Sequence, residues 1–374
     1  MRKKGFTLIE LLAVIVILAI IALIATPIIT NIISDAKKQS NERSLELYAS
    51  AIENAIETYK LNNPTKRVTT GILTSSNDGK TLTKGEETLT IDYNGNVYCE
   101  RIKMSADGNV YLSDCTVNGN KVDYKYGTNI PISFAEDSWE EIAETVKTGD
   151  LSAYKVGDTK EVALTGYTNG EANSNGLYTV RIANTSTPEE CNQEGFSQSA
   201  CGFVIEFVDI ITEHRMNPTN TNVGGWPASE MYKFLNDTTD ETIISIYERL
   251  PEDLQKVIKP TQVVSSHGKS DSSNFTSTDK LYLLSTKEVY GETTYRAEGD
   301  TMQTQNLDTA ASQTRQLDYY EYFNTFNTIK GYNHWRLRTA HPRSDYFSVI
   351  EANGKYSNCD SSNNRGVAPA FKIG

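Results

Sequence analysis

Glu10 is the residue whose position most clearly calls for chemistry. It places one carboxylate near the start of an apolar run that extends from Phe6 to about Ile33. A single charge at depth in a bilayer costs several kcal/mol, so chains keep one there mainly where a partner neutralises it. The pattern therefore predicts that Glu10 has a functional role and a partner.

The apolar run and the charges before it predict a membrane-spanning helix. Residues 6–33 are long enough to cross a hydrocarbon core of roughly 30 Å at about 1.5 Å per residue. Arg2, Lys3 and Lys4 precede the run, and the positive-inside bias places such an N-terminus in the cytoplasm and the rest of the chain outside. Pro27 lacks an amide donor and predicts a kink or a locally melted turn.

The patterns that usually indicate catalysis are missing from the sequence. His214, His267, His334 and His341 stand outside the His-Glu-x-x-His and paired Cys-x-x-Cys spacings that bind zinc. Ser266 lacks the Gly-x-Ser-x-Gly context of a hydrolase nucleophile. We therefore predict no enzymatic activity, no metal site and no cofactor.

The chain after the apolar run predicts an α+β fold. From Ser34 to Asn62 apolar residues recur every three or four positions among charged ones, as in an amphipathic helix packed on a sheet. Between Val68 and about Gly127, Asn-Gly and Asp-Gly pairs separate short apolar runs, which predicts an antiparallel meander of about four strands.

The five cysteines suggest disulfides, because the predicted topology exports them. If Ala106 to Gly108 form a three-residue hairpin loop, Cys99 and Cys115 face each other directly, within reach of a disulfide. The alternative is two separate buried thiols. Cys191 and Cys201 are close enough in sequence to close a small loop, which leaves Cys359 over.

Residues 3–12, Lys-Lys-Gly-Phe-Thr-Leu-Ile-Glu-Leu-Leu, closely resemble the processing site of type IV prepilins. The resemblance implies that a prepilin peptidase cuts after Gly5 and methylates the new N-terminus, Phe6. It also implies that Glu10 pairs with the N-terminal amine of a neighbouring subunit, which specifies register between stacked helices rather than adding net stability. Pro27 matches a proline common in these helices, and helix plus meander matches the pilin head.

Charge and length bound the rest of the chain. The formal charge is −12, and loss of Arg2, Lys3 and Lys4 with the leader lowers it to −15. An acidic surface disfavours general nucleic-acid binding through phosphate contacts, although it is compatible with a local basic patch. The 374 residues exceed one pilin head, so we expect a second domain.

The C-terminal part predicts a separate α+β domain whose ending resembles an uncharacterised module of Gram-positive surface proteins. That module typically ends in W-W-L-R-S followed by G-V-R-P-A, and this chain has Trp335, Leu337, Arg338 and Thr339, then Gly366, Val367, Pro369 and Ala370. Ala368 stands where the module usually has arginine, which puts any ligand role of that arginine in doubt here.

An aromatic and basic patch near this ending is a candidate ligand site. Its residues are Trp335, Arg336, Arg338, Arg343 and Tyr346, and its ligand would be a sugar or an anionic polymer. The stronger alternative is a half-buried strand, because alternation through residues 335–338 places Trp335 and Leu337 in a core.

These observations combine into one predicted organisation and function. The domains are a leader (1–5), a pilin helix (6–63, with 6–33 as transmembrane segment and filament core), an antiparallel sheet (64–127), a linker with a short helix (128–149) and a surface domain (150–374). We expect a type IV pilus subunit, minor or at the tip, held in the bacterial cytoplasmic membrane as a precursor and then displayed in an extracellular pilus. Its partners would be other pilin subunits, the prepilin peptidase and a surface ligand such as a glycan. The alternatives are a pseudopilin of a type II secretion or DNA-uptake machine, and a surface enzyme on a pilin-like anchor.

Overall fold

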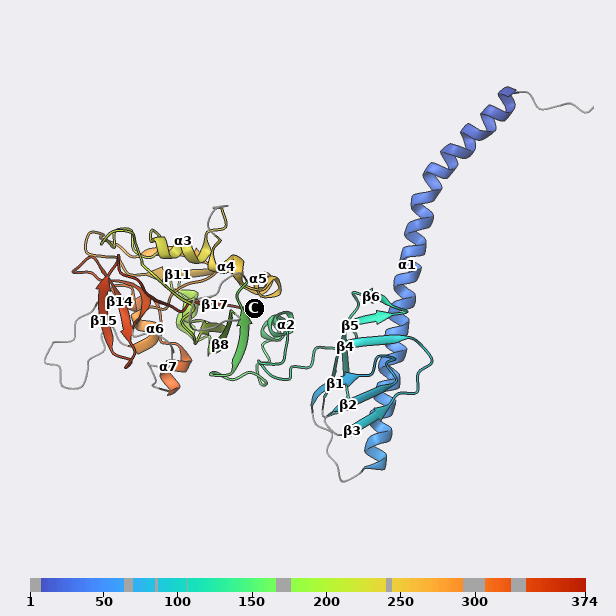
Figure 1. Ribbon diagram of the computed structural model, residues 1–374, viewed down its shortest axis with the longest axis horizontal. Helices are drawn as coiled ribbons and strands as arrows, with labels where there is room; N and C mark the ends of the chain where they lie inside the picture. The colour runs from blue at the N-terminus through green and yellow to red at the C-terminus, as the bar shows by residue number, and fades with distance from the viewer. Residues whose placement is uncertain are drawn as a thin grey trace, which may run out of the picture. The chain divides into compact units, whose positions relative to one another are not determined.

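The computed structural model divides the chain into two compact units, Met1–Ile132 and Ser133–Gly374. The structure describes residues 8–63, 70–84, 87–105, 107–165, 176–239, 244–291, 307–323 and 334–374. Each unit has its own apolar core. The mixed α+β class predicted from the sequence is therefore present in both units (Figure 1).

The first unit is built on one long helix, α1 (Leu8–Asn62). Of the two alternatives predicted at Pro27, a kink or a locally melted turn, the melted turn is wrong, because α1 stays helical through this residue. Figure 1 shows the helix curving along its N-terminal half. Thr26 and Thr30 donate hydroxyl hydrogen bonds to carbonyls one turn earlier, at 2.6 and 3.0 Å. Such back-bonding is a known cause of helix bending, which supplements the effect of proline.

The C-terminal half of α1 packs on a six-stranded antiparallel sheet. Leu45, Tyr48, Ile52 and Ile56, which the periodicity assigned to the core face, are at most 1% exposed. The sheet has the order β3-β2-β1-β4-β5-β6. Its strands are β1 (Gly71–Ser75), β2 (Thr81–Lys84), β3 (Glu87–Thr90), β4 (Val97–Met104), β5 (Val110–Val117) and β6 (Asn120–Val122).

The register of the central hairpin brings the first cysteine pair together. Cys99 on β4 faces Cys115 on β5, as the three-residue loop predicted, and their Cα atoms are 4.0 Å apart. The structure joins them in a disulfide with an S–S distance of 2.02 Å. This bridge fixes the two longest strands of the sheet at the position that faces α1.

The second unit contains two larger sheets and one hairpin. A four-stranded sheet has the order β17-β9-β8-β7, and a five-stranded sheet has the order β10-β16-β13-β14-β15. The strands are β7 (Thr159–Ala163), β8 (Leu177–Asn184), β9 (Val204–Phe207), β10 (Thr212–His214), β13 (His334–Ala340), β14 (Tyr346–Glu351), β15 (Tyr356–Asp360), β16 (Arg365–Val367) and β17 (Ala370–Lys372), with β11 (Thr261–Ser265) and β12 (Phe275–Asp279) forming the hairpin.

Short helices surround these sheets (Figure 1). They are α2 (Trp139–Thr148), α3 (Glu230–Asn236), α4 (Ile246–Arg249), α5 (Glu252–Val257), α6 (Thr286–Tyr290) and α7 (Asp318–Phe323), with 3-10 turns η1 (Glu189–Asn192), η2 (Gln198–Ala200) and η3 (Ala311–Gln313). Helix α2 begins with a capping box between Ser138 and Glu141. Trp139 and Ile142 lie in the core of the second unit. The predicted linker over 128–149 is thus wrong: its helix belongs to the second unit, which begins at Ser133.

Removing the hairpin disulfide should destabilise the first unit selectively. In the Cys99→Ala/Cys115→Ala variant we expect a loss of about 3 kcal/mol, because the bridge closes a loop of sequence separation 16. Hydrogen exchange of the β4 and β5 amides should speed up by about a hundredfold where it reports global opening. The matched control is Cys191→Ala/Cys201→Ala, which removes the bridge of the second unit. Equal β4 and β5 protection in both variants would contradict the expectation.

Candidate functional site

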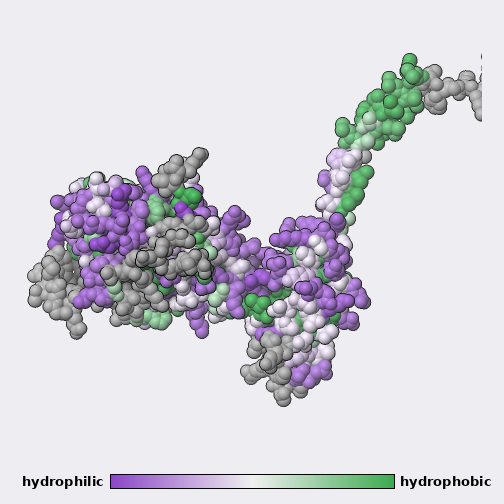
Figure 2. Space-filling model, in the orientation of Figure 1, coloured by the Kyte–Doolittle hydropathy of each residue, from purple (hydrophilic) through white to green (hydrophobic). Residues whose placement is uncertain are grey.

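The N-terminal half of α1 presents apolar side chains on every face. Consecutive residues from Val14 to Leu18 are each 46–57% exposed, and a helix turns by about 100° per residue, so no single face accounts for them. Figure 2 shows this stretch as a continuous hydrophobic surface. The exposed large apolar residues are Leu8, Ile9, Leu11, Leu12, Val14, Ile15, Val16, Ile17, Leu18, Ile20, Ile21, Leu23, Ile29, Ile32 and Ile33. A helix that is apolar all round requires an apolar environment.

The residues predicted for processing lie at the edge of what the structure describes. Gly5 and Phe6 are outside the described residues, and Glu10 is described only as part of the helical backbone. The predicted membrane span over 6–33 is not shown: among the described residues, none of the helices combines the length and apolar content needed to cross a membrane.

The predicted aromatic and basic patch of the second unit does not exist as a surface. Trp335 is 2% exposed, Arg336 and Arg338 are fully buried, and of the five residues Arg343 and Tyr346 alone are exposed. The alternative of a strand core is correct for Trp335 and Leu337. The arginines are buried as well: Arg338 lies against α6 and β11, and Arg336 lies against the connection between β15 and β16.

Arg338 forms a buried ion pair with Glu288 of α6. Its two terminal nitrogens each lie 2.5 Å from one carboxylate oxygen, and both side chains are fully buried. Burial alone would lower the pKa of Arg338 and raise that of Glu288, but their mutual attraction reverses both directions. Ser199 and Thr314 also donate to the carboxylate. This arginine therefore joins elements within the core and is not available to a ligand.

Arg336 has a different role, because backbone carbonyls rather than carboxylates receive its hydrogen bonds. It donates to the carbonyls of Cys359, Asp360 and Asn363 at 3.3, 2.6 and 2.8 Å. Burial without a carboxylate partner lowers its pKa to about 10. Arg336 thus fastens the β15–β16 connection, and Cys359 beside it is a buried free thiol.

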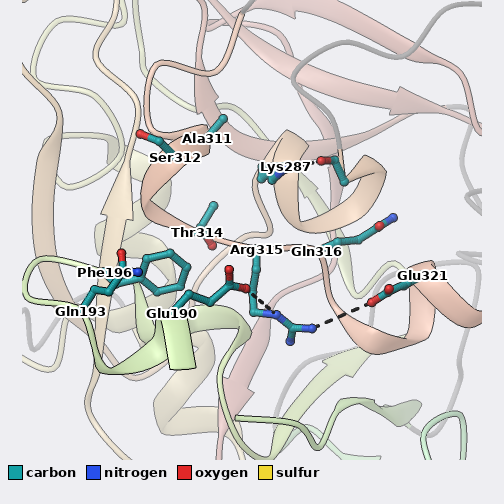
Figure 3. Close-up of a pocket in the computed structure, with 11 residues that line it drawn as sticks. Glu190, Gln193, Phe196, Lys287, Ala311, Ser312, Thr314, Arg315, Gln316 and Glu321 are labelled. Atoms are coloured by element: carbon teal, nitrogen blue, oxygen red, sulfur yellow. Dashed lines mark hydrogen bonds and ion pairs between the residues drawn. The ribbon is translucent and has the colours of Figure 1, made fainter. Parts of the chain in front are cut away.

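Residues from three segments of the second unit line a polar cavity of about 560 Å³ (Figure 3). They are Glu190, Gln193, Phe196, Lys287, Gly291, Ala311, Ser312, Thr314, Arg315, Gln316 and Glu321. The cavity has the size of a small-molecule site, although it is more polar than most. Among the described residues no group of three His, Cys, Asp or Glu side chains is placed to hold a metal ion.

Arg315 forms the wall of this cavity and is already fully engaged. Its guanidinium contacts Glu190 at 3.2 Å, Asp318 at 3.1 Å and Glu321 at 3.9 Å, two of which are drawn in Figure 3. It also donates to Asn184, at 2.8 Å. Burial tends to raise the pKa of Asp318, but hydrogen bonds from Ser186 and nearby amides outweigh it and lower the pKa. The guanidinium is therefore a structural connector rather than an anion receptor.

The second disulfide rigidifies one rim of the cavity. Cys191 is bonded to Cys201 with an S–S distance of 2.01 Å, the pairing that the short loop predicted. Phe196 forms a small buried cluster with both cysteines, and the Gln198 amide donates to the Cys191 carbonyl at 2.8 Å. Gln193 and Phe196 are consequently held on a closed loop, and Glu190 directly precedes it. Sequence reasoning found the loop but missed the cavity, because its other residues lie more than ninety positions away and share no spacing.

Comparison with known proteins identifies both ends of the chain. The prokaryotic N-terminal methylation motif matches residues 1–26. The type II secretion system core protein G of Escherichia coli (strain K12) is 31% identical over 111 residues, which are 30% of this chain and 71% of that protein. The chain belongs to the type IV pilin-like family. Residues 204–374 match a domain of unknown function, DUF6273, and no solved structure matches the chain.

In this pilin-like chain the DUF6273 match covers only part of the second folded unit. The match begins at β9, yet β9 pairs with β8, and β8 pairs with β7, both of which precede the match. Helix α2 also contributes to the same core. The folded unit that carries the DUF6273 domain therefore begins near Ser133, about seventy residues before the match.

Replacing only Arg338 should lower the free energy of unfolding far more than replacing both Arg338 and Glu288. Arg338→Met leaves a buried carboxylate without its cation, and we expect the free energy of unfolding to fall by about 3–5 kcal/mol. Arg338→Met/Glu288→Met should recover most of that loss. Urea unfolding followed by tryptophan fluorescence measures this, because all three tryptophans, Trp139, Trp226 and Trp335, lie in the second unit.

The control for this experiment is the exposed pair of Arg215 and Glu230, which are 3.2 Å apart with side chains 43% and 33% exposed. Arg215→Met should cost about 1 kcal/mol or less. A double Arg338/Glu288 variant that is as unstable as the single variant would contradict the interpretation.

Proposed function

We propose that this chain is a minor or tip subunit of a type IV pilus, which displays its second unit as an adhesive binding domain. The precursor enters the cytoplasmic membrane, prepilin peptidase cuts it after Gly5, and α1 then joins a helical bundle in an extracellular filament. The second unit binds a surface ligand and performs no catalysis.

The exposed apolar surface of α1 is the observation that carries this proposal. Among the side chains that the structure describes between Leu8 and Ile33, fifteen large apolar ones are exposed. Monomeric soluble proteins rarely leave such a contiguous surface uncovered, so it requires lipid, other helices, or each in turn. The methylation motif, residues 1–26, overlaps this surface and supports the proposed order of insertion, cleavage and assembly.

The size of the second unit supports a sparse or terminal position. It comprises residues 133–374, against 1–132 for the pilin-like unit. Filament subunits pack their heads around a common core of helices, and an appendage larger than the head is easiest to accommodate where neighbours are few.

The polar cavity of Figure 3 is the proposed ligand site. Its rim offers amide, hydroxyl and carboxylate groups from Gln193, Ser312 and Glu321, while its guanidinium is occupied by carboxylates of the protein. Lys287 also lines the cavity, where its ammonium donates to the Gly291 carbonyl. This mixture of hydrogen-bond donors and acceptors suits the many hydroxyl groups of a glycan.

A pseudopilin role is the second candidate, and the likeness to the type II secretion system core protein G favours it. In that role α1 would assemble in the same way, but the short filament would serve secretion or uptake rather than adhesion.

Two substitutions near the N-terminus test the filament proposal in the native host. Gly5→Ser should leave the leader uncut. Glu10→Ala should be cut, yet its amount in sheared surface filaments should fall about tenfold or more, because a subunit amine is left without its partner. Glu42→Ala, a carboxylate on the same helix beyond the apolar run, is the control. Normal display of both test variants would refute the proposal; loss of a secreted protein without surface filaments would favour the pseudopilin.

Ligand binding tests the cavity. The full chain in detergent should bind a glycan from an array of cell-surface polysaccharides, and Gln193→Ala/Ser312→Ala should weaken binding about tenfold, at roughly 0.5–1.5 kcal/mol per lost hydrogen bond. Both side chains are exposed, so folding should be unaffected. Ser152→Ala/Asn353→Ala alters the same kinds of group elsewhere on the second unit. Glycan binding that survives the cavity variant would exclude this cavity as the site.

A further inference from the structure

A second cavity, in the first unit, is bordered by lysines at the end of the apolar surface of α1. Its volume is about 250 Å³. Ser34, Lys37, Lys38 and Asn41 line it from α1, and Lys121, Val122, Asp123 and Tyr124 line it from β6 and the residues after it. The four α1 residues recur at helical spacing and therefore share one face of the helix.

The charge of this cavity contrasts with that of the whole chain. Three lysines face one carboxylate, Asp123, whereas the formal charge of the protein is −12. Lys37, Lys38 and Lys121 are exposed, and within the described part of the chain they form no ion pair. Three lysines lining one small cavity favour an anionic ligand.

The position of the cavity along α1 indicates which anion. Ile33 is the last residue of the exposed apolar run, and Lys37 and Lys38 follow it by four and five residues, about 6 and 7.5 Å along the helix axis. The polar interface of a bilayer is roughly 5–8 Å deep on each side of the hydrocarbon core. With the apolar run in the core, the lysines lie at the depth of the lipid phosphates. Their charge would add about 1 kcal/mol each to binding an anionic membrane surface.

We propose that Lys37, Lys38 and Lys121 form a binding site for the phosphate of an anionic phospholipid headgroup, which holds the precursor at the outer face of the membrane. This inference rests on the proposed membrane-inserted precursor. The hydroxyl of Ser34 and the amide of Asn41 supply further hydrogen-bond donors from the same face of α1. Release of this contact would accompany transfer of α1 from lipid to the filament.

Soluble short-chain lipids test the site without requiring insertion or assembly. We would titrate the full chain, in a nonionic detergent, with dihexanoyl phosphatidylglycerol, dihexanoyl phosphatidylcholine and inorganic phosphate, and measure Kd by calorimetry. Phosphatidylglycerol should bind, and added salt should weaken it. Lys37→Gln/Lys38→Gln/Lys121→Gln should raise its Kd about a hundredfold.

Two matched variants make the test specific. Replacement of the same three lysines by arginine keeps the charge and should preserve binding. Lys147→Gln/Lys155→Gln/Lys355→Gln removes three exposed lysines of the second unit and should change nothing. Lipid binding in detergent does not require filaments. If phosphatidylglycerol does not bind while filament assembly still depends on Glu10, the lipid-site inference is wrong and the proposed pilus function stands.

Three results would overturn the proposal. Inorganic phosphate binding as tightly as phosphatidylglycerol would indicate a free-anion site. Equal binding of phosphatidylcholine would show that negative charge on the lipid is irrelevant. The third result is that the glutamine variant binds phosphatidylglycerol as well as the parent does but is lost from surface filaments. This would indicate that the lysines contact carboxylates of a neighbouring subunit instead of lipid.

Discussion

One uninterrupted helix must satisfy two environments, and the organisation of the molecule follows from that constraint. From Leu8 to Ile33 α1 exposes apolar side chains all round, whereas from Leu45 onward one stripe is buried against its own sheet. The two halves are joined through Pro27 without a break in the helix. Because the helix is continuous, the partners that cover its apolar half also orient the sheet that is packed on its other half. That packing must therefore be stable. The disulfide between Cys99 and Cys115 lies within the core that α1 and the sheet share.

The second unit depends on a different interaction, the ion pair between Arg338 and Glu288. Glu288 also closes the capping box of α6, where its carboxylate accepts the Ser285 amide at 2.9 Å. One carboxylate therefore fixes the start of a helix and the position of strand β13 together. Arg338 adds hydrogen bonds to the carbonyls of Leu283 and Val264, so that four segments meet at one guanidinium. Such a centre contributes little net stability compared with apolar packing, but misassembly around it would leave a charge buried and unpaired.

Local patterns predicted local structure well. The apolar stripe of α1, the hairpin register that pairs Cys99 with Cys115, and the short loop between Cys191 and Cys201 all follow from spacing along a few residues. About four strands were predicted for the first sheet, and the structure has six. The sequence did not reveal β2 and β3, TLTK and ETLT, because each is short and half-exposed and has few apolar residues. The prediction that the arginines of β13 are exposed is wrong for another reason. Alternation predicts which side chains share a face, but not that α6, β11 and the β15–β16 connection cover the opposite face. The cavity around Arg315 combines residues from three distant segments, so no periodicity could reveal it.

Each of the two units has a hydrophobic core of its own. The second unit is connected to the first by a single passage of the chain near Ser133. The C-terminal end of the second unit is part of its own four-stranded sheet: β17 pairs with β9, and Ala370 forms a β-bridge with Tyr282. A domain closed by its own last strand needs no partner element from the pilin head to complete its fold. Substitutions around the cavity of the second unit can therefore leave the core between α1 and its sheet undisturbed, and changes in the apolar half of α1 can leave the second unit intact. A binding role carried by the second unit and an assembly role carried by the first are consistent with this physical independence.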